Sequence, residues 1–216
     1  SGAPWPHVDE LEVGNTLEHA GYALTWLVAM LGPVRRVTAF ASRLVHEKNM
    51  GVPLERQAAD FSVAALQHES GAVSRLTCSI VAPHDHRLLI AGEEGALWVE
   101  DCWKPTSPVR RRGRIELLGR SREAPFAQRL KLLGDADAIA ASKGRRKVDF
   151  CLGPVDLARA IREGRAPRLS ARFCLHITEV ALAISNALDG PAVVEIESRF
   201  DAPEPMPWAT QGGGTA

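Results

Sequence analysis

The strand-like segments of this sequence come in pairs that are separated by only a few residues. Residues 60–68 and 72–81 are rich in apolar and β-branched residues, and only a Glu-Ser-Gly turn lies between them. Residues 87–91 and 96–100 form a second pair around a Gly-Glu-Glu-Gly turn. Because parallel strands need a long crossover connection, such short turns predict antiparallel β-hairpins.

Helical segments lie on either side of these hairpins. Residues 16–31 and 171–188 carry apolar residues at helical spacing, and Gly32-Pro33 ends the first helix. The full predicted order is helix 16–31, strand 34–45, polar loop 46–56, the two hairpins, helix 154–163, helix 171–188 and strand 191–197. Because helices and strands do not alternate, we predict an α+β fold, a predominantly antiparallel open sheet with helices packed on one face. No Gly-x-Gly-x-x-Gly turn opens a helix, so we predict no Rossmann domain in this chain.

The length of 216 residues fits one large domain, which we expect over residues 1–200, with a Pro- and Gly-rich tail at 201–216. Hydrophobic residues at 45% and charged residues at 24% exclude a disordered or collagen-like chain. No apolar run reaches the roughly 18 residues of a membrane helix, and four scattered cysteines favour reduced thiols in the cytoplasm. Residues 1–13 are expected to be an approach segment, rich in Pro and acidic residues, and the start at Ser1-Gly2 suggests part of a longer protein.

A formal net charge of zero hides an uneven distribution of charge. Residues 104–147 contain 13 Lys and Arg against four acidic residues, whereas the rest of the chain contains 13 basic and 22 acidic residues. So basic a segment is typical of nucleic-acid binders, but few aromatic residues for base stacking lie near it. We therefore expect an exposed insertion or a subunit contact, with a strand near 114–118, a short helix near 126–133 and no nucleic-acid partner.

One face of the first helix carries polar and aromatic side chains instead of the usual surface charges. At 100° per residue, Asn15, His19, Tyr22 and Trp26 fall in one stripe. The opposite, aliphatic stripe is predicted to pack on the sheet and consists of Leu17, Ala20, Leu24, Leu27, Val28 and Leu31. The polar stripe predicts a ligand site or a contact with a second domain. The alternative is a helix between two layers, with His19 and Tyr22 as satisfied interior groups.

The other histidines give weaker indications. His84 and His86 are spaced like metal ligands on one face of a strand, but no third ligand stands at a recognisable spacing, so we predict no metal site. His176 lies among apolar residues and is predicted to be a core histidine.

Four features follow one another in a fixed order along the chain. Helix 16–31 runs into Gly32-Pro33-Val34 and a strand, and the hairpin 60–81 turns at Ser70-Gly71-Ala72. Residues 90–99, IAGEEGALWV, fit the pattern I-x-G-x-x-G-x-L-x-V, and two helices follow near the end. Over about residues 1–200 this set resembles the C-terminal domain of the glucose–fructose oxidoreductase/inositol dehydrogenase (Gfo/Idh/MocA) family.

The resemblance implies a two-domain enzyme. In this family an N-terminal Rossmann domain binds NAD or NADP, and a C-terminal domain of this kind supplies substrate contacts and the oligomer interface. We therefore expect a parent protein that moves a hydride between a nicotinamide and a hydroxyl or carbonyl carbon of a sugar-like substrate. The chain alone is expected to bind no cofactor and to be inactive. Its expected partners are the N-terminal Rossmann domain of the same parent chain, a small-molecule substrate and further copies of itself, but no membrane.

The family's first helix carries Asp-x-Gly-x-His-x-x-Asp, and its histidine falls on His19. The resemblance gives His19 a proton-transfer or binding role at the substrate, which suits an imidazole because free imidazole titrates near neutral pH. The two family aspartates fall on Asn15 and Tyr22, which are expected to contact substrate but provide no carboxylate. Lys48 and Asn49, in the loop after the first strand, are expected to be further substrate contacts.

These departures from the family pattern leave a second hypothesis open. Asn15 in place of an acid supports a non-enzymatic oligomerisation or ligand-binding module. Glu18, at the edge of the polar stripe, is either a stand-in carboxylate or a solvated helix charge. In both hypotheses we expect a homodimer or homotetramer through the open sheet face, which needs cover. The apolar residues that motivate this are Phe61, Val63, Ala65, Leu76, Cys78 and Ile80.

Overall fold

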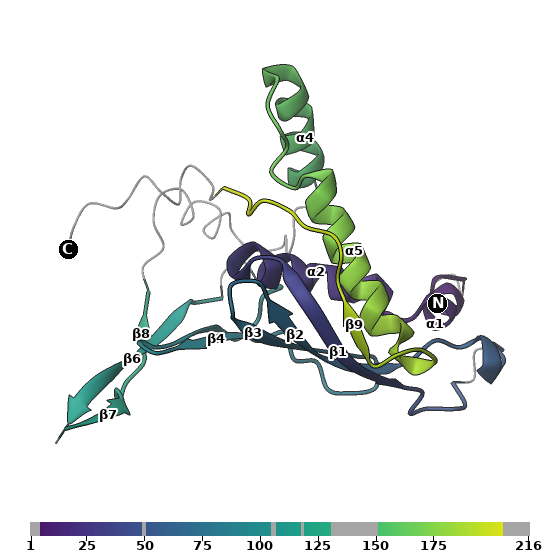
Figure 1. The fold of residues 1–216 in the computed structure, drawn as a ribbon. Helices are drawn as coiled ribbons and strands as arrows, with labels where there is room; N and C mark the ends of the chain where they lie inside the picture. The colour runs from purple at the N-terminus through teal and green to yellow at the C-terminus, as the bar shows by residue number, and fades with distance from the viewer. Residues whose placement is uncertain (1–4, 49–50, 105–106, 118, 131–150, 205–216) are drawn as a thin grey trace. The chain divides into compact units, whose positions relative to one another are not determined.

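The computed structural model describes residues 5–48, 51–104, 107–117, 119–130 and 151–204 (Figure 1). The chain divides into two compact units. The first unit comprises residues 1–82 and 160–203, and the second comprises residues 83–159 and 204–216. Each unit is described by itself.

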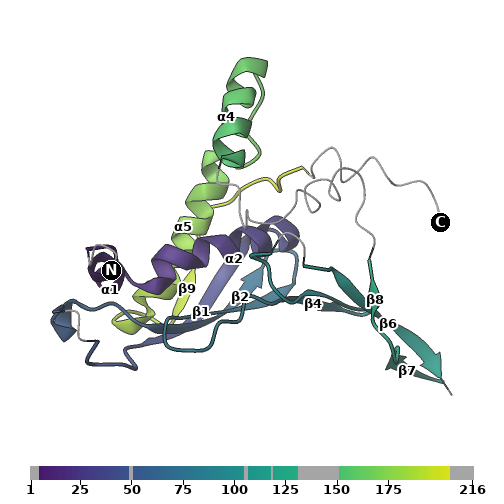
Figure 2. The same ribbon diagram turned by 180° about the vertical axis from the view of Figure 1, so that it is seen from behind.

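The first unit is a four-stranded antiparallel sheet in the order β3-β2-β1-β9. Its elements are α1 (Trp5–Val13), α2 (Asn15–Leu31), β1 (Val34–Ser42), the 3₁₀ turn η1 (Leu54–Arg56), β2 (Phe61–His68), β3 (Val73–Ser79), α5 (Ala171–Ser185), the 3₁₀ turn η2 (Asn186–Leu188) and β9 (Val193–Glu195). Both views place α2 and α5 on the same face of this sheet (Figure 1 and Figure 2). The predicted α+β class, with an antiparallel open sheet and helices on one face, is confirmed.

Strand β2 shows why one face is covered and the other open. Its side chains alternate, so that Ser62, Ala64 and Leu66 are buried toward the helices while the intervening residues, Phe61, Val63 and Ala65, point to the open face. The prediction that Leu76 and Cys78 of strand β3 lie on the open face is wrong. Cys78 pairs with Ser62 in the ladder, and Leu76 pairs with Ala64, so both lie on the helix-covered face. The open face nonetheless carries apolar side chains: Phe40 and Val193 lie on it and are 57% and 54% exposed.

The second unit holds a second antiparallel sheet, in the order β4-β5-β6-β7, with β8 also paired to β6. Its elements are β4 (Leu88–Gly92), β5 (Gly95–Val99), β6 (Arg110–Leu117), β7 (Arg120–Glu123), β8 (Gln128–Arg129) and most of α4 (Leu152–Glu163). Gly95 has a φ of 136°, and a Cβ atom there would lie 2.1 Å from the carbonyl oxygen of Arg112. Only glycine therefore fits where the predicted β4–β5 hairpin meets β6.

One helix was not predicted, and two predictions of local structure are wrong. Residues 5–13, expected only as an approach segment, form helix α1, in which the missing N–H of Pro6 is harmless because it lies in the first turn. The short helix expected near 126–133 is replaced over its described part by β8, whose residues pair with β6. Strand β1 ends at Ser42 instead of residue 45, because the next backbone N–H groups bind a side chain, as described below. The end of this expected helix, residues 131–133, lies outside the described residues. The same holds for the rest of the basic segment, up to residue 147, and for residues 205–216 of the tail.

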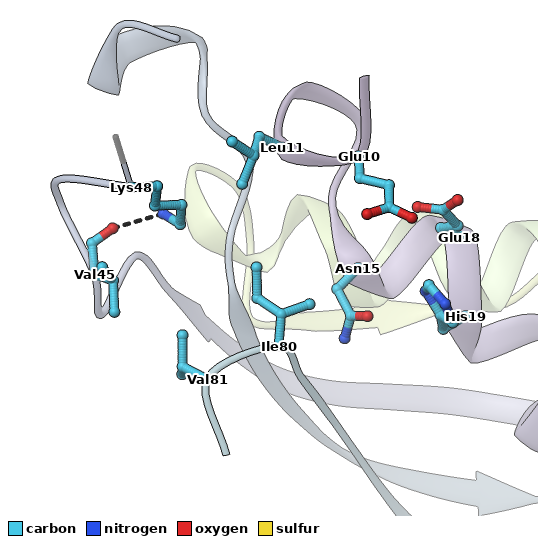
Figure 3. Close-up of a pocket in the computed structure, with 9 residues that line it drawn as sticks. All are labelled: Glu10, Leu11, Asn15, Glu18, His19, Val45, Lys48, Ile80 and Val81. Atoms are coloured by element: carbon cyan, nitrogen blue, oxygen red, sulfur yellow. Dashed lines mark hydrogen bonds between the residues drawn. The ribbon is translucent and has the colours of Figure 1, made fainter. Parts of the chain in front are cut away.

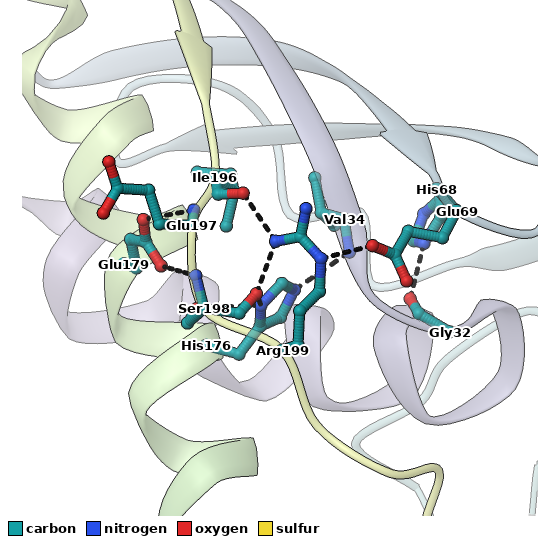
Figure 4. Close-up of polar contacts among 10 residues, drawn as sticks. All are labelled: Gly32, Val34, His68, Glu69, His176, Glu179, Ile196, Glu197, Ser198 and Arg199. Carbon is teal, nitrogen blue, oxygen red and sulfur yellow. Dashed lines mark hydrogen bonds and ion pairs between the residues drawn. The ribbon is translucent and has the colours of Figure 1, made fainter.

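His176 is fully buried in the first unit and ties α5 to the start of β1 (Figure 4). Its Nε2 accepts a hydrogen bond from the Val34 N–H at 2.9 Å, and its Nδ1 donates to the Ser198 carbonyl at 3.0 Å. An Nε2 that accepts carries no proton, so this geometry needs the neutral imidazole. The prediction that His176 is a core histidine is confirmed.

A second buried histidine lies on the other side of the turn between α2 and β1. His68 is 3% exposed; its Nδ1 donates to the Gly32 carbonyl at 2.8 Å, and its Nε2 lies 2.9 Å from the Ser74 hydroxyl. Burial lowers the pKa of His68 despite the opposing hydrogen bond to Gly32. Two imidazoles that are neutral in the folded chain therefore stabilise the turn between α2 and β1.

The four cysteines, all within the described residues, form no disulfide. No helix in the described part of the chain is both long enough and apolar enough to cross a bilayer. The described residues also contain no group of three or more side chains arranged to hold a metal ion. The rings of His84 and His86 lie 5.6 Å apart in the second unit, without a third ligand among the described residues.

Candidate substrate pocket

Helix α2 divides into the two faces that its sequence predicts. Ala20, Leu24 and Val28 are buried against the sheet and α5, and the opposite stripe is exposed. Tyr22 and Trp26 are 46% and 51% exposed, so the stripe is a surface of this unit and not the interior of two layers. The aliphatic face is thus confirmed, and the polar face is available to a ligand or to another domain.

A tight junction with α1 fixes the beginning of α2. Gly14 has a φ of 91°, and a Cβ atom there would lie 2.7 Å from the Cβ of Ala58. Its N–H donates to the Glu10 carbonyl at 2.8 Å, which ends α1 and turns the chain into α2. This junction brings the last turn of α1 beside Asn15, the first residue of α2.

The polar stripe of α2 opens into a pocket of about 360 Å³ within the first unit (Figure 3). The pocket is lined by Glu10 and Leu11 from α1, Asn15, Glu18 and His19 from α2, Val45 and Lys48 from the loop after β1, and Ile80 and Val81 after β3. Segments from four parts of the chain therefore converge on the residues that the helical pattern singles out.

The structure brings together three of the five predicted site residues. Asn15, His19 and Lys48 line the pocket, whereas Tyr22 lies one turn further along α2, with its ring centroid 6.5 Å from that of His19. Asn49 lies outside the described residues. Their roles as substrate contacts stay predictions.

The sequence interpretation missed the contribution of α1. Glu10 lines the pocket but lies in the approach segment, for which no helix was predicted. A helical interpretation of residues 5–13, from Pro6 in the first turn and the Gly14 after it, would have placed Glu10 on a helix directly ahead of Asn15.

Lys48 is held in place by a buried ion pair. Its Nζ lies 2.9 Å from Oδ2 of Asp60, and the side chains are only 8% and 1% exposed. The same ammonium donates to the Val45 carbonyl at 2.6 Å and to Oε1 of Gln57 at 2.7 Å. Because an ammonium has three N–H groups, Lys48 has already met its hydrogen-bonding capacity, and its stem shapes the pocket wall.

Asp60 organises the loop that carries this wall. Its carboxylate also accepts hydrogen bonds from the N–H groups of Leu44, at 2.7 Å, and Val45, at 3.0 Å. Burial raises the pKa of the Asp60 carboxyl, but the hydrogen bonds from Leu44, Lys48 and Val45 outweigh burial and leave the pKa below its usual value. These bonds take up the backbone groups that would have continued β1.

A second, more open pocket of about 610 Å³ lies elsewhere in the first unit. Its lining includes Arg43, Gln57 and Asp189, and the Arg43 guanidinium lies 3.9 Å from the Asp189 carboxylate. It contains none of the residues of the polar stripe of α2.

The chemistry of the first pocket suits hydroxyl groups. The Asn15 amide donates and accepts hydrogen bonds, and the neutral imidazole of His19 has one ring nitrogen that accepts and one that donates. The carboxylates of Glu10 and Glu18 are further acceptors. The set can therefore orient a polyhydroxylated molecule and exchange a proton with one of its hydroxyls.

Comparison with known proteins gives one match to a family model. Residues 2–98 match the family model described as the GFO/IDH/MocA C-terminal domain. No curated protein matches the chain.

Solved structures share the fold at low sequence identity. Levoglucosan dehydrogenase in complex with NADH and levoglucosan is 15% identical with a TM-score of 0.64, over 83% of this chain and 49% of that one. A probable dehydrogenase from Thermotoga maritima is 18% identical with a TM-score of 0.56, over 87% and 52%. An oxidoreductase from Agrobacterium radiobacter in complex with NAD+, L-tartaric acid and magnesium is 15% identical with a TM-score of 0.54, over 82% and 47%. This chain thus spans about half the length of each.

Proposed function

We propose that this chain, whose residues 2–98 match the model of the GFO/IDH/MocA C-terminal domain, is the substrate-binding and oligomerisation half of an NAD(P)-dependent oxidoreductase. The parent enzyme acts on a hydroxyl or carbonyl carbon of a sugar-like substrate, in the cytoplasm. The observation that supports this proposal is that Asn15 and His19 line one pocket. By the sequence resemblance, the family's first aspartate and its histidine fall on these two residues.

In this proposal His19 is the group that handles the proton. A ring nitrogen of His19 takes the proton of the substrate hydroxyl during oxidation and returns it during reduction. Asn15 binds a neighbouring hydroxyl and orients the ring, since an amide cannot act as a carboxylate base. Lys48 takes part through its stem and its tie to Asp60, which hold the pocket wall in place.

The dinucleotide is assigned to another domain of the parent protein. Every strand pair among the described residues is antiparallel, and none of the described helices follows a glycine-rich turn from a parallel strand. These residues therefore do not fit a pyrophosphate-binding site. The proposal predicts that the chain alone neither binds NADH nor oxidises a sugar.

Replacing His19 by asparagine in the parent enzyme is expected to lower kcat by about 10²- to 10⁴-fold, because proton transfer is lost while a hydrogen-bonding group of similar size remains. Steady-state kinetics with a sugar and NAD or NADP at one fixed pH measure the effect. His84→Asn makes the same chemical change at an exposed residue that does not line the pocket; it is the control and should change kcat less than threefold, a factor of roughly 0.6 kcal/mol in barrier height. Unchanged kcat in His19→Asn would refute the role of His19.

The open face of the first unit's sheet is proposed as the homo-oligomer interface. Phe40 pairs with Val63, and Val193 pairs with Thr38 on the same side of β1, so these apolar side chains lie on the sheet face that none of the described helices of this unit covers. Exposed apolar patches of this kind mark association sites.

Phe40→Asp is expected to convert the dimer or tetramer into a monomer, because it places a charge within this apolar face. Sedimentation velocity measures the change. The control Leu175→Asp alters an equally exposed apolar residue on α5 and should leave the oligomer intact. A wild-type chain that sediments as a monomer at micromolar concentration would contradict the interface.

A non-enzymatic ligand-binding module is the second candidate. The observation that favours it is Asn15, which puts an amide where the family has a carboxylate. The variant Asn15→Asp, made in the full-length protein, distinguishes the two candidate functions. If the protein is an enzyme, the variant stays active and His19→Asn is the damaging change; if it is a binding module, neither form turns over a sugar with NAD or NADP.

A further inference from the structure

The sheet of the second unit separates its acidic residues from half of its arginines. Glu123 lies opposite Arg114 in the β6–β7 ladder, and Glu116 lies opposite Ser121. Because side chains alternate along a strand, both acids belong to the face that also carries Arg112. The contacts agree with this register. The Arg112 guanidinium lies 3.5 Å from the Glu123 carboxylate, and Nε of Arg114 donates to the Ser121 hydroxyl at 2.9 Å. The arginines of this face are therefore partly neutralised.

The other face of the sheet combines cations with apolar side chains. Across the ladders, Arg111 lies opposite Leu97, Arg122 opposite Ile115, and Arg120 opposite Leu117. None of the described strand residues on this face is acidic. We call it the arginine face and define it by Arg111, Arg120, Arg122, Leu97, Ile115 and Leu117.

The side chains of the arginine face are accessible. The three arginines are exposed, and Leu97, Ile115 and Leu117 are 38%, 42% and 50% exposed. Residues 114–117 of β6 pair only with β7, so the sheet ends in a two-stranded ribbon (Figure 1). None of the described helices packs on this ribbon. Two apolar and two cationic side chains therefore share one surface at its end.

This combination favours a lipid surface over other polyanions. The phosphate backbone of a nucleic acid would bind the guanidinium groups, but it offers nothing to exposed isoleucine and leucine side chains. A membrane with anionic lipids offers both parts: headgroups that attract arginine, and an acyl boundary that takes up apolar side chains. The charge and the apolar content of the arginine face are thus complementary to such a membrane.

We propose that the arginine face of the second unit docks on an anionic lipid surface. Arg111, Arg120 and Arg122 bind the headgroups, and Ile115 and Leu117 enter the acyl boundary. The sequence predicts no membrane partner, because the acids stand among the arginines along the chain; the strand register separates them. Anionic lipids face the cytoplasm, which is the compartment of the proposed function. The docking face goes beyond that function and does not depend on the substrate pocket.

The first test is flotation of the 216-residue chain with lipid vesicles at low salt. One set consists of phosphatidylcholine alone, and the other contains about 30% phosphatidylglycerol to supply negative charge. The wild-type chain is expected to bind the anionic vesicles at least tenfold more tightly, a roughly estimated factor for several arginines near the surface. Raising the salt to about 0.5 M should weaken this binding, because salt screens the attraction. Both arms use the wild-type chain and need no variant to fold.

Three double variants assign the binding to this face. Arg120→Gln/Arg122→Gln is expected to weaken binding to the anionic vesicles by roughly tenfold. Arg110→Gln/Arg129→Gln removes the same charge from two arginines that lie opposite one another on the other face. This matched control should change binding by less than about threefold, because its charges lie farther from the lipid. Ile115→Ser/Leu117→Ser keeps the charge and should weaken binding by roughly tenfold, because apolar area no longer leaves water.

The contrary outcomes are distinct. Wild-type chain that binds neither set of vesicles, or binds both equally, would overturn the proposal. An equal loss in Arg110→Gln/Arg129→Gln and Arg120→Gln/Arg122→Gln would overturn the assignment to the arginine face. A DNA duplex or poly-L-glutamate that displaces the chain from anionic vesicles, together with unchanged binding in Ile115→Ser/Leu117→Ser, would replace the lipid by a nucleic acid or an acidic protein. These measurements involve neither sugar nor dinucleotide, so their failure leaves the proposed function standing.

Discussion

Replacing Asp60 by asparagine is expected to lower the free energy of unfolding by about 3 to 5 kcal/mol, the usual cost of removing one partner of a buried ion pair. The variant leaves the Lys48 ammonium, whose side chain is 8% exposed, without its counter-charge. It also weakens the bonds that the carboxylate accepts from the Leu44 and Val45 N–H groups. Equilibrium unfolding in urea measures the change.

A second variant and a control make this result specific. Asp60→Asn/Lys48→Met removes both charges and should be more stable than Asp60→Asn alone, because no buried charge is left unpaired. Asp189→Asn makes the same chemical change in an exposed pair with Arg43 and should shift stability by less than about 0.5 kcal/mol. A loss of under 1 kcal/mol in Asp60→Asn would show that the pair does not hold the loop.

The folded chain is expected to lose stability as the pH falls below 6.5, by up to about 1.4 kcal/mol per pH unit for each of His176 and His68. Burial lowers the pKa of both imidazoles from the ordinary value of 6.5. Near His176 the bond to Ser198 and the charge of Glu179 oppose burial, and the Arg199 guanidinium adds to it.

The sign follows from proton uptake. Between pH 6.5 and the lowered pKa values, the unfolded imidazoles bind protons that the folded ones do not, so the unfolded state is favoured as the pH falls. The lowered pKa values of the Asp60 and Glu179 carboxyls act in a separate window, because their contribution is lost only as the pH falls through the carboxyl range, below about 4.

Urea unfolding at several pH values between about 7.5 and 5.5 measures this dependence. His176→Gln should show about half the wild-type slope, since only His68 then remains. His46→Gln changes an exposed histidine in the loop after β1 and should retain the wild-type slope. A free energy of unfolding that stays constant over this range in the wild-type chain would rule out neutral, buried imidazoles at this corner.

The parts of the site that the sequence predicts are those encoded within one element. The positions of Asn15 and His19 follow from the period of a single helix whose other face is aliphatic, and α2 shows both faces. Tyr22 lies in the same stripe but not among the pocket-lining residues, because the pocket ends within one turn of the helix. The helical period therefore predicts which way a side chain points, but not how far a pocket extends along the helix.

The contacts that the sequence does not predict join distant segments. Val34 and His176 are 142 positions apart, and their hydrogen bond depends on how α5 packs on the sheet. Lys48 lies in the loop after β1, and Asp60 is the residue before β2. Only the folded loop brings the two side chains together. Glu10 was missed because the Pro- and acid-rich sequence of α1 carries a weak helical signal. Each of these depends on tertiary packing, which overrides local pattern.

The polar stripe of α2 is proposed to form a substrate pocket. A crystal structure of the 216-residue chain grown with D-glucose would show whether a sugar binds there. The sugar should lie against α1 and α2, with a hydroxyl within about 3 Å of a ring nitrogen of His19 and another near the Asn15 amide. A sugar bound instead in the second pocket, beside Arg43 and Asp189, would contradict the claim.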